Sequence, residues 1–177
     1  MKKVLINLAL ILIGFVIYFF QANFFSWFSI GGIRPNLFVI YVLFIGLFGN
    51  RSMGIVYGAV WGIFLDLIYK TNVGINLIGL VLIGVISILF NKNFSKDSRI
   101  TVMFMVLGTT IIFEVITYFI TYMLYSINVE ILSFIKILIV EIIYNILVTI
   151  IIYPLMQKFG YYMENEYKGN KILTRYF

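Results

Sequence analysis

Cysteine and histidine are both absent from the sequence. Without cysteine the chain forms no disulfide and has no thiol nucleophile. Without histidine it lacks the commonest metal ligand and general base, which excludes most zinc enzymes and Ser-His intramembrane proteases. The sequence also shows no nucleophile beside an orienting base, no Walker loop and no dinucleotide motif. We therefore expect a protein that is not an enzyme and uses no metal or cofactor.

Charge is scarce as well. Charged residues make up 11% of the 177 residues, whereas hydrophobic residues make up 63% and the mean hydropathy is +1.08. A soluble domain has about 25% charged residues, so this chain could not cover a surface that faces water. Its apolar runs are long and do not alternate with polar residues, which favours helices over a barrel. The composition predicts an all-α membrane protein with residues 1–177 in a single polytopic domain.

Six apolar segments predict a bundle of six transmembrane helices. They cover approximately residues 4–21, 34–49, 53–69, 75–90, 100–126 and 132–157. A span needs about 20 residues, and the second segment is the weakest by this measure. Pro35 near its start suits a first helical turn, where the missing N–H is not needed. Lys2 and Lys3 before the first segment resemble a signal peptide, but no small-residue cleavage site follows, which indicates a retained span.

The basic residues support this count. With six spans and both termini in the cytoplasm, ten basic residues lie inside and three lie outside, which is the bias that the positive-inside rule expects. The three outer residues are Arg34, Lys70 and Lys136. If the second segment did not span, the 92–99 loop and the C-terminal tail would carry seven basic residues outside. The net charge of +6 is thus explained by topology, and we expect no nucleic-acid partner.

Aromatic residues gather between the first and second segments, where Trp27 and Phe28 stand with Phe24 and Phe25. Such residues are typical of the membrane interface. They fit either a membrane anchor or a surface for a protein partner.

Small residues recur every four positions in the third segment, at Gly54, Gly58 and Gly62, and Asp66 follows at the next step. Residues four apart share a helix face, and glycines allow close helix packing in lipid. The stripe fits packing within the bundle or a docking surface for a partner helix. Asp66 fits an ion pair with Lys70 at i+4 or a functional carboxylate in the membrane.

Polar residues line one face of each of the last two segments. Glu114 and Tyr118 lie on the fifth, and Glu141, Tyr144 and Asn145 lie on the sixth. We expect the two faces to meet, and one or both glutamates to be protonated, because a buried site disfavours the charged form. Together with Asp66 and Asn76, these residues fit polar contacts between helices, a small polar cavity or a proton site.

The order of these motifs resembles the MreD family of bacterial rod-shape systems. The resemblance rests on these motifs: Arg34-Pro35-Asn36-Leu37, the run from Gly58 through Gly62 to Asp66, Gly74-Ile75-Asn76, and Tyr153-Pro154-Leu155. Asn36 replaces an acid that is usual in the family, and no proline precedes Gly74. The resemblance covers most of the chain.

The resemblance implies a non-enzymatic scaffold in the bacterial cytoplasmic membrane. MreD-like proteins act with MreC and MreB filaments and help to position RodA and its penicillin-binding transpeptidase in wall synthesis. Their fold is similar to the substrate-binding (S) subunits of energy-coupling-factor transporters, which gives an alternative: a vitamin-binding transporter subunit. Such subunits often carry an Ala-x-x-x-Ala pattern in the first helix, but Ala9 is followed at i+4 by Ile13.

Overall fold

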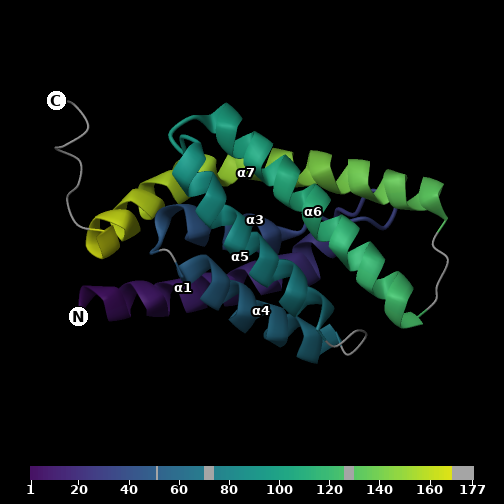
Figure 1. Cartoon of the computed structure of the whole chain (residues 1–177), viewed down its shortest axis with the longest axis horizontal. Helices are drawn as coiled ribbons and strands as arrows, with labels where there is room; N and C mark the ends of the chain where they lie inside the picture. Colours follow the sequence, from purple (N-terminus) through teal and green to yellow (C-terminus); the bar gives the residue numbers. More distant parts are fainter. Residues whose placement is uncertain (51, 70–73, 126–129, 169–177) are drawn as a thin grey trace.

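The computed structural model describes residues 1–50, 52–69, 74–125 and 130–168, and in these residues the chain is a bundle of helices (Figure 1). Helix α1 (Lys2–Phe19) continues through the π-helical turn η1 (Phe20–Phe24) into the short α2 (Phe25–Trp27). The remaining helices are α3 (Leu37–Phe48), α4 (Met53–Tyr69), α5 (Ile75–Asn93), α6 (Arg99–Tyr125) and α7 (Ile131–Lys168).

Among the described residues, four helical stretches are long and apolar enough to cross a membrane: Lys2–Trp27, Ile75–Asn93, Arg99–Leu124 and Ile131–Tyr167. Helices α3 and α4 have only 12 and 17 residues. At 1.5 Å per residue they are about 18 and 26 Å long, less than the roughly 30 Å of a hydrocarbon core. The prediction of an all-helical membrane protein is confirmed in this form, while the six-span topology stays a prediction.

Helix α3 forms the centre of the bundle, and all 12 of its residues are buried. It contacts α1, α4, α5, α6 and α7 (Figure 1). A helix that is apolar on every side is stable where neighbours surround it completely. The segment that is the weakest candidate span is therefore the core of the protein.

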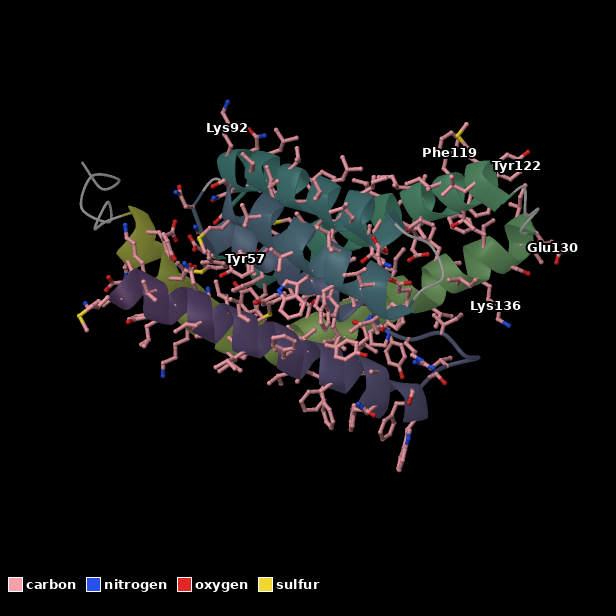
Figure 2. The ribbon with its side chains drawn as sticks, turned by 90° about the horizontal axis from the view of Figure 1, so that it is seen from below. Tyr57, Lys92, Phe119, Tyr122, Glu130 and Lys136 are labelled. Carbon is pink, nitrogen blue, oxygen red and sulfur yellow. The ribbon has the colours of Figure 1, made fainter. Side chains whose placement is uncertain are left out.

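The helices run alternately between two ends of the bundle. Two ion pairs lie at one end. The Nζ of Lys2, near the start of α1, lies 3.0 Å from the Oε1 of Glu166 in α7, and the Nζ of Lys96, after α5, lies 2.6 Å from the Oε1 of Glu164. The Lys96 ammonium also donates to the carbonyl of Leu47, which brings the end of α3 to the same place. Figure 2 shows Lys92 at this end and Glu130 at the opposite one.

Three boundaries differ from the sequence prediction. Pro35 lies before α3 rather than in its first turn, because the side chain of Asn36 caps the helix by accepting from the amide of Val39. The first helical stretch continues to Trp27 through η1, well past residue 21. The last helix continues to Lys168, well past the predicted end of the segment at residue 157.

Pro154 lies inside α7. Proline removes one hydrogen bond of a helix and kinks it, and Figure 1 shows the last part of α7 turning toward the start of α1. Gly160 lies in this part, where an added Cβ would be 2.5 Å from the ring of Phe48. The bend thus allows α7 to cover the end of α3.

Candidate functional site

The glycine stripe of α4 lies against α5. A Cβ added at Gly58 would be 2.5 Å from the carbonyl oxygen of Leu80, and one at Gly62 would be 2.5 Å from the Cα of Leu77. Gly54 faces Gly84 of α5 and Gly46 of α3. Since these backbones touch, the stripe is covered within the chain. Of the two alternatives, this position favours packing within the bundle over a docking surface for a partner helix.

Asp66 follows the stripe and is 5% exposed. One of its carboxylate oxygens accepts hydrogen bonds from the backbone amide and side-chain amide of Asn76, and the other accepts from the amides of Gly74 and Leu77. All four distances lie between 2.9 and 3.1 Å. Gly74 has φ = 100°, a conformation that favours glycine. Asp66 therefore caps α5, while Lys70, its expected partner, lies outside the described residues.

Helix α3 begins in a polar cluster from three other parts of the chain. The backbone amide of Asn36 donates to the side-chain oxygen of Asn145 at 2.8 Å, and the amide of Leu37 donates to Gln21 at 3.0 Å. Asn145 is fully buried and donates in turn to the hydroxyl of Thr110. These bonds satisfy amides that every helix start leaves free, so Asn145 acts as a structural link between α7, α6 and α3.

The two membrane glutamates meet next to this cluster. The side chains of Glu114 in α6 and Glu141 in α7 lie next to each other. Two carboxyl groups can share a hydrogen bond only if one of them carries a proton, because ionised carboxylates only accept. Glu141 is 6% exposed, and its Oε1 has no hydrogen-bond partner among the described residues. The pair links α6 to α7.

The remaining predicted residues make other contacts or are exposed. The ring centroid of Tyr118 lies 4.5 Å from that of Phe134 in α7. The Tyr144 hydroxyl donates to the carbonyl of Phe28. Trp27 is 89% exposed, consistent with contact to the membrane interface or to a partner. Arg34 and Pro154 are exposed as well.

A groove of about 360 Å³ lies between α1, α4 and the end of α7. Ile11, Val56 and Val60 form apolar walls. Asn7 forms its polar part, since the hydroxyls of Tyr57 and Tyr167 donate to the Asn7 side-chain oxygen at 3.2 and 2.8 Å. Figure 2 shows Tyr57 between α4 and α1. Sequence reasoning missed this site, because its polar residues are up to 160 positions apart.

A second set of contacts that the sequence did not reveal closes the same end of the bundle. The hydroxyl of Tyr153 donates to the carbonyls of Lys96 and Asp97, and Tyr161 donates to the Asp97 carboxylate. Arg99 lies 5.7 Å from the centroid of the Tyr153 ring. The end of α7 thus holds the α5–α6 connection in place.

The model of the family described as rod shape-determining protein MreD matches residues 2–163. The chain belongs to the MreD family. Comparison with curated proteins and with solved structures gives no match. Membership of the MreD family makes this a membrane protein of rod-shape determination, and the likeness to S subunits stays a prediction.

The MreD family is a structural, shape-determining family and not a known enzyme family. Among the residues that the structure describes, no group of three His, Cys, Asp or Glu could hold a metal ion. Two of the MreD motifs have a structural role in this chain. The run from Gly58 to Asp66 and the sequence Gly74-Ile75-Asn76 form the contact between α4 and α5.

Proposed function

We propose that this protein is a non-enzymatic scaffold of the bacterial cell-elongation machinery, which lies in the cytoplasmic membrane and binds an MreC-like protein. The observation that carries the proposal is the MreD family match over residues 2–163. Further partners would be RodA with its penicillin-binding transpeptidase and MreB filaments. The packing supports a scaffold, since glycine contacts and buried hydrogen bonds hold the helices together.

The groove between α1 and α4 is the best candidate for the partner contact. The glycine stripe is already covered by α5, whereas Val56 and Val60 are 53% and 52% exposed beside Asn7. In lipid, hydrogen bonds and close packing join helices, so a polar group on a bilayer-facing groove favours a neighbouring helix. We infer that a transmembrane helix of the MreC-like partner lies in this groove.

Site-specific crosslinking tests the proposal. The photoreactive residue p-benzoylphenylalanine is introduced at Val56, and the full chain is expressed with its MreC-like partner and illuminated in membranes. The matched control carries the same residue at Ile143 on α7, which is 52% exposed. We expect a crosslink to the MreC-like protein from position 56 and none from position 143.

The outcomes separate the two parts of the proposal. A crosslink from position 143 alone would contradict the groove but keep the partner. Absence of any crosslink, together with failure of the two proteins to co-purify in mild detergent, would refute the scaffold. Co-purification of an ATPase module instead would favour the vitamin-transporter alternative.

A further inference from the structure

An apolar crevice of about 370 Å³ opens on the side of the bundle between α1 with η1, α3 and α7. Its floor belongs to the core helix: Ile40 and Tyr41 are 2% and 4% exposed. Its rims are open, because Phe20 of η1 is 44% exposed and Ile151 of α7 is 76% exposed. The crevice is therefore a lateral route to a helix whose residues are all buried.

The lining offers no hydrogen bond to a ligand. Every described residue that lines the crevice is aliphatic, aromatic or methionine. Tyr41 has the only hydroxyl among them, and that hydroxyl donates to the carbonyl of Leu10 at 2.5 Å. Water needs two to four polar partners in a buried site. A water-filled or polar-ligand site is thus disfavoured.

The lining also disfavours a partner helix. Close approach of two helices in lipid relies on small residues such as Gly, Ala and Ser. None of these is among the described lining residues, and large side chains such as Phe20, Phe24 and Met156 occupy those positions instead. A flexible hydrocarbon chain can follow such an irregular surface, whereas a helix of about 10 Å diameter cannot.

The rims continue directly into the surface that faces lipid. Val16 and Phe19 of α1 are 53% and 60% exposed, and the ring centroid of Phe19 lies 6.2 Å from that of Phe20 at the rim. An empty crevice would leave its wall atoms without dispersion contacts. We propose that an acyl chain of a membrane phospholipid occupies this crevice, lies against α3 and completes the packing between α1 and α7.

Photolabelling in a bilayer tests the proposal. The full chain is placed in nanodiscs of phosphatidylcholine that carries a diazirine on one acyl chain, illuminated and mapped by mass spectrometry. We expect label on Ile40 or Tyr41, in addition to label on exposed residues. Because all of α3 is buried, label there reports entry through the crevice.

A pair of variants supplies the control. Ile152→Trp enlarges a crevice residue, and Ile143→Trp makes the same kind of change at a position of α7 outside the crevice that is 52% exposed. We expect loss of the α3 label in Ile152→Trp and the wild-type label in Ile143→Trp. If Ile152→Trp does not elute as a folded protein, Val148→Phe, at another crevice residue, replaces it.

Two results would overturn the proposal: labelled surface residues with no label on α3, or an α3 label that both variants retain. Crosslinks from the crevice to a co-expressed protein that abolish the lipid label would assign the site to a partner helix instead. The labelling uses no MreC-like protein, so its failure would leave the proposed function standing.

Discussion

At the scale of single residues, Asp66 matters because it joins two helices at a point where amides would otherwise be unpaired. Backbone amides of Gly74, Asn76 and Leu77 reach its carboxylate. The first turn of any helix leaves its N–H groups without partners in the helix, and such groups are costly when buried away from water. The carboxylate satisfies three of them and holds the end of α4 against the start of α5.

Asp66→Asn should therefore destabilise the protein. The amide retains one acceptor oxygen in place of two and loses the charge that strengthens these bonds. Hydrogen bonds to charged groups contribute about 1.5–3 kcal/mol each, and a cap contributes about 1 kcal/mol, so we expect a loss of about 2 kcal/mol. Thermal unfolding in detergent measures this loss of stability. Glu130→Gln, at an exposed carboxylate with one contact of 3.5 Å, is the control; equal losses in both variants would contradict the capping role.

The sequence predicts residue positions better than residue partners. Helical spacing places Glu114 and Glu141 on facing stripes, and the structure places their side chains in contact. Spacing cannot show that Asn145 reaches the amide of Asn36, because 109 positions separate them and only the packing of α7 on α3 joins them. The hydrogen-bond donors to Asp66 were not predicted for the same reason: they belong to the start of α5, and the i+4 rule applies only within one helix.

At the scale of helices, the contact between α4 and α5 depends on missing side chains. Gly58→Ala would place a Cβ 2.5 Å from the Leu80 carbonyl, and this backbone atom cannot move without separating the helices. Overpacking costs about 1–3 kcal/mol, and we expect a loss of stability in this range. Gly108→Ala is the matched control, since its nearest atom is 3.9 Å away and alanine favours helix by about 1 kcal/mol. A Gly58→Ala protein as stable as Gly108→Ala would show that the helices are not in close contact.

The bend of α7 depends on Pro154. Pro154→Ala restores an N–H to the helix and should straighten it, which moves the last turns away from Phe48. Spin labels can be attached to cysteines introduced at Ile139 and Tyr162, which are 52% and 47% exposed. Because the natural chain has no cysteine, only these two positions are labelled. A straight helix separates these positions by about 35 Å, so their distance should rise toward this value. Leu155→Ala, at an exposed neighbour, should leave the distance unchanged; no increase in Pro154→Ala would assign the bend to tertiary contacts.

The apolar runs of the sequence predict where helices occur, but they do not predict where the helices end. Residues 22–27 contain polar and aromatic residues, and hydropathy alone ended the first span before them, whereas backbone bonding carries the helix through η1 to Trp27. Similarly, the charged residues near Glu164 marked the end of a span, but they continue α7 and pair with Lys96 and Lys2. Hydropathy reports where lipid ends, while a helix continues as long as its residues have contacts.

At the scale of the whole molecule, the short α3 and α4 leave two topologies to compare. If both cross the bilayer, the chain has six spans, and Ser52, between α3 and α4, lies on the cytoplasmic side. If neither crosses, four spans remain and both termini keep their side, but Ser52 lies outside. We predict six, because Lys96 donates to the carbonyl of Leu47 and so brings the end of α3 to the α5–α6 connection.

Single cysteines distinguish these topologies, since the natural chain has none. Ser52→Cys reports the side on which the chain passes from α3 to α4, while Lys92→Cys and Glu130→Cys mark the two opposite ends seen in Figure 2. All three positions are exposed. With six spans, a membrane-impermeant maleimide added to intact cells should label Glu130→Cys alone, and permeabilised cells should label all three. We expect Ser52 on the inner side because the core helix α3 is shielded from lipid on all sides. Its 12 residues therefore do not have to span the bilayer without neighbouring helices. Labelling of Ser52→Cys in intact cells, with Lys92→Cys still protected, would instead establish four spans and make α3 and α4 a hairpin that enters from outside.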